Sequence, residues 1–143
     1  VVSGVGLVTI YEFLRAYQQS DEDESLRLAM INGDAGAAIS QFALEGRSPL
    51  ALEALDLFIQ IYGAQAGNLA LTVSPRAGVY LAGGIAAKNL ERFKLGGFIK
   101  AFLDKGRMKP LMEKVPVRIV LQPKIGLLGA RLLAQQFTVY SNT

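Results

Sequence analysis

The sequence predicts an α/β fold that is rich in helices, and three observations support this prediction. Residues 77–82 form an apolar run without clean alternation, which is typical of a strand covered on both faces in a parallel sheet. Residues 117–121 indicate a second short strand, preceded by Pro116. Elsewhere, apolar residues recur at helical spacing. With 143 residues, 51% of them hydrophobic, the chain is long enough for one domain with its own core.

The amino-terminal segment is expected to contain a strand end, a glycine turn and a helix. Val1 has the character of a residue inside a strand and is not an initiator methionine, so we expect a piece of a longer protein. The turn contains Gly4 and Gly6, and the helix continues to Tyr17. The Gly4-x-Gly6 spacing is close to the dinucleotide-binding fingerprint. It lacks the third glycine and the acidic residue expected about 20 positions later, so it is a weak match.

Capping residues mark the helices that follow. Asp34 is expected to cap a helix over residues 35–44. Ser48 and Pro49 are typical of the N-cap and the first position of the longest helix, which ends near residue 73.

Two glycines inside this longest helix indicate close packing. Gly63 and Gly67 lie one turn apart on the same stripe, and each lowers helix propensity by about 1 kcal/mol relative to alanine. That cost indicates that another element lies very near this face, and we expect that element to be a sheet.

The second half of the chain alternates between short helices and breaks. Gly83 and Gly84 end the first strand and open a helix. In the last helix, Gly126, Gly129 and Ala130 form a small face that we expect to lie close to another backbone. The predicted helices of this half cover residues 88–94, 98–103, 108–114 and 126–139.

Charge is distributed unevenly along the chain, although the net charge is only +3. Residues 1–87 contain 4 Lys and Arg against 9 Asp and Glu, whereas residues 88–131 contain 11 against 3. A basic second half suits an anionic ligand such as a nucleotide or a sugar phosphate. A solvated basic surface without a ligand is the alternative, and charge alone is compatible with both.

The absence of two residue types narrows the chemistry. The chain has no Cys and no His, which excludes disulfides, thiol nucleophiles, the commonest general base and the commonest metal ligand. No paired carboxylates follow the strands, and neither a nucleophile elbow nor a Gly-Lys-Ser/Thr phosphate loop is present. We therefore expect no catalytic residue and no metal ligand within this segment.

No secretory signal or membrane span is predicted. Glu12 and Arg15 interrupt the first apolar run, and Gln60, Gln65 and Asn68 interrupt the longest helix. A reducing cytoplasm is compatible with the lack of cysteine, so we expect a cytoplasmic location and no membrane partner.

What remains is a set of three glycine junctions, at residues 3–6, 83–84 and 126–129. Each alone is more often a tight turn than a ligand site. Three in one small α/β chain favour a nucleotide cleft, because ligands bind beyond the carboxyl ends of parallel strands and glycine lets the backbone approach a phosphate. The junction at Gly83 and Gly84 directly follows a strand and is the main candidate.

Taken in order, five segments resemble the carboxyl-terminal half of bacterial glucokinases. They begin at Ser3, Gly67, Gly78, Asp104 and Gly126, with the sequences SGVGLV, GNLAL, GVYLAGGI, DKGR and GLLGA. Their order and spacing agree with the family, and the resemblance covers nearly all 143 residues. One departure is Val5, where we expect the family to favour proline in a turn.

The resemblance implies the larger domain of the actin-like ATPase fold, which is ribonuclease H-like, with its sheet incomplete in this fragment. Residues 1–143 would be a single partial domain, the nucleotide-binding half of the enzyme. Gly83 and Gly84 would match the turn that contacts adenosine. Ser3, Gly4 and Gly6 would line the cleft near the hinge, and the helix from Gly126 would cross back toward the other domain.

The resemblance also implies the reaction. An intact enzyme would transfer the γ-phosphoryl group of ATP, with Mg²⁺, to the 6-hydroxyl of glucose. The catalytic base and the sugar-contacting residues would lie in a missing amino-terminal part, so the fragment alone is expected to be inactive. An incomplete sheet leaves an edge or a face uncovered, which favours self-association, for example as a homodimer.

Two other functions stay open from the sequence. One is a kinase of the same superfamily acting on another sugar, and the other is a sugar-responsive transcription regulator with a kinase-like domain. A nucleic-acid partner for residues 88–131 is not expected, because Phe93, Phe98 and Phe102 have the spacing of helix core residues rather than of stacking platforms.

Overall fold

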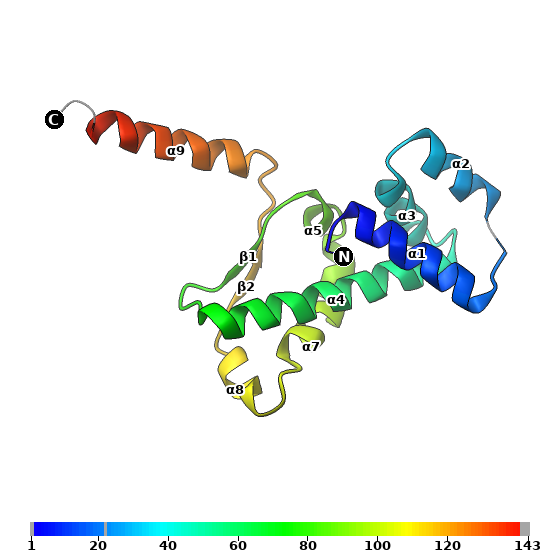
Figure 1. The fold of residues 1–143 in the computed structure, drawn as a ribbon, viewed down its shortest axis with the longest axis horizontal. Helices are drawn as coiled ribbons and strands as arrows, with labels where there is room; N and C mark the ends of the chain where they lie inside the picture. Colours follow the sequence, from blue (N-terminus) through cyan, green and yellow to red (C-terminus); the bar gives the residue numbers. More distant parts are fainter. Residues whose placement is uncertain (1, 22, 141–143) are drawn as a thin grey trace.

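The computed structural model describes residues 2–21 and 23–140, with side chains described up to residue 136. Over these residues the chain is helix-rich α/β with a small two-stranded sheet, as predicted (Figure 1). In chain order, the elements are α1 Gly4–Gln18, α2 Glu24–Asn32, α3 Ala35–Leu44, α4 Pro49–Val73, β1 Val79–Leu81, α5 Gly84–Lys88, α6 Leu90–Lys94, α7 Gly97–Leu103, the 3₁₀-helix η1 Gly106–Met108, α8 Lys109–Met112, β2 Val117–Ile119 and α9 Ile125–Tyr140.

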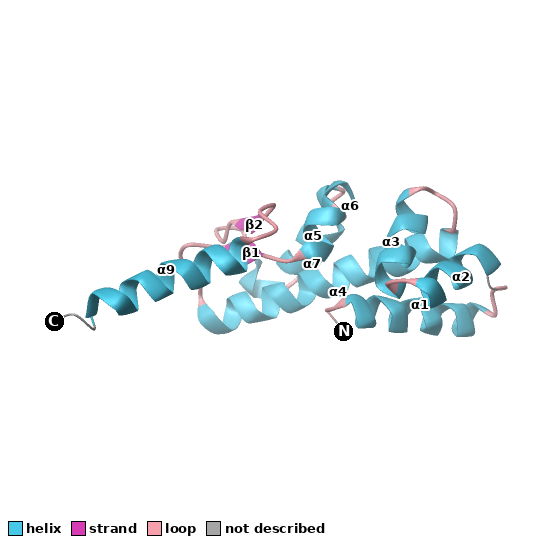
Figure 2. Cartoon of the chain, turned by 90° about the horizontal axis from the view of Figure 1, so that it is seen from above, coloured by secondary structure: helices cyan, strands magenta, loops and turns pink. Residues whose placement is uncertain are grey.

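The long helix α4 is the spine on which the other helices pack, with α1 and α3 against one part of it and α7 against another (Figures 1 and 2). Its start follows the predicted caps. Ser48 Oγ accepts a hydrogen bond from the Ala51 N–H at 3.2 Å, and Pro49 occupies the first turn. Asp34 Oδ1 likewise accepts from the Ala37 N–H at 3.0 Å and begins α3. Both capping predictions are confirmed.

An aromatic cluster joins α4 to α6 and α7. Tyr62 meets Phe93 edge-on at 6.0 Å and Phe98 at 5.7 Å, measured between ring centroids. Phe102 continues the stack from Phe98. The three phenylalanines are 4%, 2% and 1% exposed, so their assignment to the core rather than to a stacking surface is confirmed.

Gly63 and Gly67 let α7 lie directly on the backbone of α4. A Cβ at Gly63 would stand 2.2 Å from the Phe98 carbonyl oxygen, and one at Gly67 would stand 2.6 Å from the Phe102 carbonyl oxygen. The predicted close approach is therefore confirmed, but the partner is a helix and not the expected sheet. The spacing of glycines in a helix indicates that a neighbouring element comes close, but it does not indicate whether that element is a helix or a strand.

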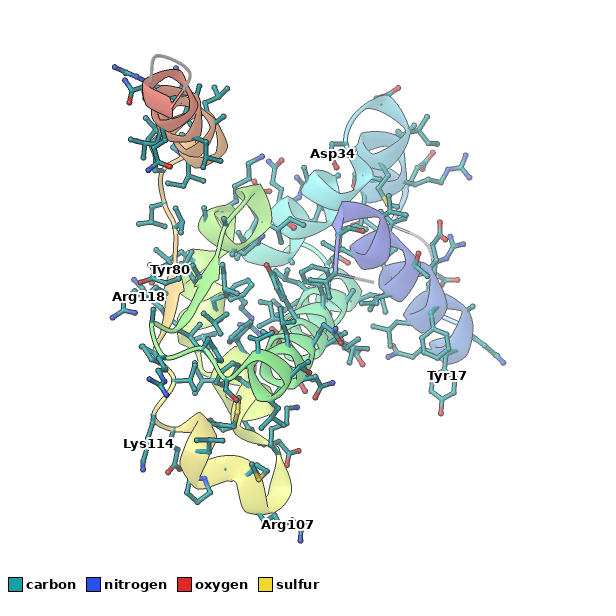
Figure 3. All side chains as sticks on the ribbon, turned by 60° about the vertical axis from the view of Figure 1, so that its left-hand side comes forward. Tyr17, Asp34, Tyr80, Arg107, Lys114 and Arg118 are labelled. Atoms are coloured by element: carbon teal, nitrogen blue, oxygen red, sulfur yellow. The ribbon has the colours of Figure 1, made fainter. Side chains whose placement is uncertain are left out.

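The two strands form one parallel pair. Val79 pairs with Val117, Tyr80 with Arg118 and Leu81 with Ile119. Both predicted strands are present, but each is shorter than expected. The expectation that the first strand is covered on both faces is wrong among the described residues, because Tyr80 is 56% exposed. The Arg118 guanidinium lies 5.6 Å from the Tyr80 ring centre (Figure 3).

Helix α9 projects away from the remaining elements (Figure 1). No atom lies within 4 Å of the position that a Cβ would take at Gly126 or Gly129, so the expected close approach of these glycines to another backbone is wrong for the described chain. The described side chains of α9 are all exposed, and its large apolar ones are Ile125, Leu127, Leu128, Leu132 and Leu133.

Candidate functional site

The first turn of α1 contains three of the predicted site residues. Ser3 is the N-cap, and its Oγ accepts a hydrogen bond from the Gly6 N–H at 3.2 Å. Gly4 and Gly6 are therefore the first residues of the helix, and the predicted glycine turn before the helix is wrong. The reason is that the serine hydroxyl satisfies a backbone donor of the first turn, so the helix begins at Gly4. The predicted strand end includes Val1, which lies outside the described residues, and Val2 and Ser3 are not in a strand.

The turn after β1 contains the other two predicted residues. Gly83 has φ 115° and ψ 169°, a conformation that essentially requires glycine, and Gly84 is the first residue of α5. The surroundings of both glycines are open. A Cβ at Gly83 would meet nothing within 4 Å, and one at Gly84 would meet only the end of the Lys88 side chain at 3.9 Å. The glycines therefore leave room beside the chain instead of fitting against another part of it.

The structure brings Gly4 and Gly84 together, although they are 80 positions apart in the sequence. Both line a cavity of about 550 Å³ between α1, α3 and α5. Gly36 allows α3 to pack closely against the start of α1, because a Cβ at Gly36 would lie 3.0 Å from the Gly4 carbonyl oxygen. The volume falls within the range of about 300–1,000 Å³ that is usual for small-molecule sites.

The remaining predicted residues lie around this cavity rather than in its lining. Ser3 and Gly6 lie outside the lining, but their hydrogen bond sets where α1 begins and so positions Gly4, which is in the lining. Gly83 lines a second cavity of about 470 Å³, on the other side of the turn, which reaches the segment before α9. Gly84 and Lys88 of α5 line both cavities.

Sequence reasoning missed the contribution of α3 and of Asn89 to the cavity. Ser40, Gln41 and Leu44 line it from α3, a helix for which the sequence pattern indicates only the cap at Asp34. Asn89 lines it from the junction of α5 and α6, and it is 2% exposed. The sequence offers one signal for Asn89, which is a polar amide among the apolar residues of the predicted helix 88–94.

An ion pair holds α6 against α4. The Arg92 guanidinium donates two hydrogen bonds to the Asp56 carboxylate. These hydrogen bonds raise the pKa of Arg92 above its ordinary value, although partial burial acts in the opposite direction.

The basic second half does not gather at the cavity. Lys88 lies in its wall. Arg107 lies in η1, Lys114 in the turn after α8 and Arg118 in β2, all far from Asp34 in Figure 3. Lys100 and Lys109 line a different hollow beside α7. The lining of the cavity therefore contains one lysine, and most of the other described basic residues lie away from it.

Two further findings concern membranes and metals. Within the part of the chain that the structure describes, none of the helices combines the length and the apolar character needed to span a bilayer. Among the same residues, no three Asp, Glu, His or Cys side chains gather closely enough to hold a metal ion.

Comparison with known proteins gives a consistent result. The family model described as Glucokinase matches residues 1–137. The glucokinase of Synechocystis sp. is 46% identical over 149 aligned residues, which cover 95% of this chain and 41% of that protein. The glucokinase of Nostoc punctiforme is 47% identical, with 94% of this chain and 42% of that protein covered.

A solved structure agrees in fold. The crystal structure of a glucokinase from an Antarctic psychrotroph superposes with a TM-score of 0.73 at 28% identity, over 90% of this chain and 37% of that one. The chain thus spans about two fifths of the length of the relatives that it matches. The match to the family model extends over nearly all of its residues, and the chain therefore belongs to the glucokinase family.

Proposed function

We propose that residues 1–143 supply the carboxyl-terminal, nucleotide-binding half of a glucokinase. The complete enzyme would transfer the γ-phosphoryl group of ATP to the 6-hydroxyl of glucose and release glucose 6-phosphate and ADP. The observation that carries this proposal is the cavity between Gly4 and Gly84, within a chain that matches the glucokinase family over residues 1–137.

The proposed architecture is the larger domain of the actin-like ATPase fold, with residues 1–143 as a single partial domain. The parallel pairing of β1 with β2 supports it, since the Gly83-Gly84 turn lies at the carboxyl end of β1, where open α/β sheets bind ligands. The exposed face at Tyr80 supports the idea that other parts of a complete enzyme extend or cover this sheet.

The nucleotide would lie against Gly84 on one side and the first turn of α1 on the other, and Gly83, which lines the neighbouring cavity, would set the course of the turn that leads to Gly84. Glycine at both places allows close approach of a ribose or a phosphate. Helix α1 has 15 residues, so its amino end carries unsatisfied N–H groups and the positive end of the helix dipole, which favour an anion. Ser3 and Gly6 would act by setting where this helix begins. Lys88 adds a positive charge to a lining that also contains Asp34 and Glu45.

The chemistry proposed for this half is positioning and charge stabilisation, which dominate phosphoryl transfer. Mg²⁺ would arrive with the ATP phosphates, because it is usually held by phosphates and one or two carboxylates. The described residues offer no cluster of metal ligands, so no step is assigned to a metal bound by this chain. Residues 1–143 in isolation are expected to release no ADP in the presence of glucose.

Glucose and ATP are the proposed small-molecule partners, and the amino-terminal part of the enzyme is the proposed protein partner. The exposed leucines of α9 support self-association of the isolated chain, including a homodimer. No nucleic-acid partner is proposed, and the cytoplasm is the proposed location.

A Gly84→Val variant of the complete protein tests the assignment. The added side chain has room in the ligand-free cavity, so folding is retained, while the nucleotide loses that space. We expect KM for ATP to rise at least tenfold with KM for glucose unchanged, measured in a coupled assay for ADP release. Gly33→Val is the matched control, because Gly33 lies outside the cavity lining and its Cβ would make only an ordinary contact.

Two results would count against the proposal. One is an unchanged KM for ATP in a folded Gly84→Val protein. The other is a wild-type protein that phosphorylates no glucose, and a panel of other hexoses would then identify a related sugar kinase.

A further inference from the structure

The connection between α2 and α3 places an asparagine directly before a glycine in an open turn. Asn32 is the last residue of α2, and only Gly33 and Asp34 separate it from the start of α3 at Ala35. Asn32, Gly33 and Asp34 are all exposed. Gly33 has φ −153° and ψ −152°, an extended conformation, so its backbone turns out of the helix immediately after Asn32.

The groups that would react in this turn are not held by hydrogen bonds. The N–H that follows a helix usually donates to its last turn, as the Ser74 N–H does to the Ala70 carbonyl oxygen at 2.9 Å. The Gly33 N–H makes no such bond at the end of α2, and the side-chain amide of Asn32 has no hydrogen-bond partner among the described residues. Glycine also has no side chain to shield its own backbone nitrogen.

These two residues have the chemistry for spontaneous deamidation, which needs water and no other reactant. The Gly33 backbone nitrogen loses its proton to solvent and attacks the side-chain carbonyl carbon of Asn32. A carbon–nitrogen bond forms, the bond to the side-chain nitrogen breaks, and ammonia leaves a cyclic succinimide. Water then opens the ring at either of its carbonyl groups, which gives aspartate or iso-aspartate at position 32.

We infer that Asn32 is a site of spontaneous deamidation in the folded protein. Asparagine is among the thermolabile residues, and here the fold leaves both reacting groups exposed. The inference concerns the chemical ageing of the chain and does not depend on the proposed function.

The product would change the start of α3. Iso-aspartate adds a methylene group to the main chain, and a connection of two residues has little slack to absorb it. Asp34 lies next in this connection, and its Oδ1 caps α3 by accepting from the Ala37 N–H at 3.0 Å. Asp34 also lines the cavity between α1, α3 and α5, so deamidation would act beside that lining.

Mass spectrometry of the complete protein, aged in mildly alkaline buffer and then digested with trypsin, tests the inference. Cleavage after Arg27 and Arg47 releases a peptide in which Asn32 is the only asparagine. Replacing its amide by a carboxyl group adds about 1 Da, and aspartate and iso-aspartate should elute as two products. Asn68 is the internal control, because it is exposed but is followed by Leu69 within α4. Asn32 should react about tenfold faster than Asn68, or more.

Gly33→Ala tests the route through the backbone nitrogen. A Cβ at Gly33 would meet only the Ala29 carbonyl oxygen, at 3.5 Å, and alanine adopts the extended conformation, so folding is retained. The methyl group hinders attack by the nitrogen of the same residue, and deamidation at Asn32 should slow by about tenfold.

Two results on wild-type protein would overturn the inference without any variant having to fold. One is deamidation of Asn32 that is no faster than that of Asn68. The other is a rate in the native protein that is lower by about tenfold or more than in a synthetic peptide of residues 28–47, because the fold would then protect Asn32. An unchanged rate in folded Gly33→Ala would refute the proposed route.

Discussion

Gly83 carries the backbone strain of the candidate site. With φ 115° and ψ 169°, it occupies a region that side chains other than glycine rarely enter. Gly83→Ala should therefore lower the free energy of unfolding by about 1–3 kcal/mol, although no atom obstructs the added Cβ. Chemical denaturation followed by circular dichroism measures the difference.

Gly84→Ala is the matched control for this strain. Gly84 has an ordinary helical start and open space, so its substitution should change stability by less than about 0.5 kcal/mol. Equal losses at both positions would show that packing, not backbone conformation, requires glycine in this turn.

Asp23 gives a prediction that depends on pH. The Ser25 hydroxyl donates to its carboxylate at 2.7 Å and the Leu26 N–H at 3.1 Å, and these bonds lower the pKa of Asp23. A lowered pKa in the folded state stabilises the protein above about pH 4, the pKa of an unfolded aspartate, and this stability is lost as the pH falls through the folded pKa. Asp23→Asn keeps a capping oxygen without the charge.

Wild type should therefore exceed Asp23→Asn by about 0.5 kcal/mol at pH 7, a small value because the site is exposed to solvent. The difference should shrink as the pH falls below about 4, the pKa of an unfolded aspartate, as measured by urea denaturation at pH 7 and at a series of lower values. A difference that is constant across this range would mean that the charge of Asp23 makes no contribution.

At the scale of elements, the contact between α4 and α7 depends on Gly63. An alanine Cβ would stand 2.2 Å from the Phe98 carbonyl oxygen, and backbone cannot move aside as a flexible side chain can. Gly63→Ala should destabilise the protein by about 1–3 kcal/mol, even though alanine favours the helix by about 1 kcal/mol. Thermal unfolding should show the loss as a lower midpoint.

Gly129→Ala separates helix propensity from packing. No atom lies near its Cβ position, so this variant should increase the helical signal without lowering the midpoint. A Gly63→Ala protein as stable as wild type would contradict the close contact between the two helices.

The helices and their caps were predictable from the sequence because their signals are local. Ser48 with Pro49, and Asp34 before α3, mark helix starts through hydrogen bonds that span three residues. The partner of Gly63 was not predictable, because Phe98 lies 35 positions away and a glycine indicates only that some backbone comes close. The start of α1 was misplaced because the Ser3 cap was interpreted as part of a glycine turn.

The candidate site was predictable only in part for the same reason. Gly84 follows a strand, and that position alone made it a candidate. Its meeting with Gly4 in one cavity depends on the packing of α1 and α3 at Gly36, which no local pattern reports. Asn89 lies in the lining because α5 and α6 meet there, which is a property of the folded structure and not of the sequence.

At the scale of the whole molecule, apolar surface is divided unequally between the core and α9. Core residues such as Leu55, Phe58 and Ile39 are almost completely buried. In α9, Leu127 is 70% exposed and Leu132 is 62% exposed. Because burying one leucine contributes about 1.5–3 kcal/mol, α9 adds little to the stability of the described chain and leaves a surface that favours association.

Removal of α9 tests this division. A chain ending at residue 124 should unfold within about 2 °C of residues 1–143, because the described side chains of α9, up to residue 136, are exposed and lie outside the core. It should also remain monomeric at concentrations where residues 1–143 associate, as measured by analytical ultracentrifugation. Leu127→Lys combined with Leu132→Lys in the longer chain should reproduce the monomer, since the charges oppose burial of the same face. A midpoint that falls by 10 °C or more on truncation would instead place α9 against the core, and association that survives both changes would place the contact elsewhere, for example at the exposed Tyr80 face of the sheet.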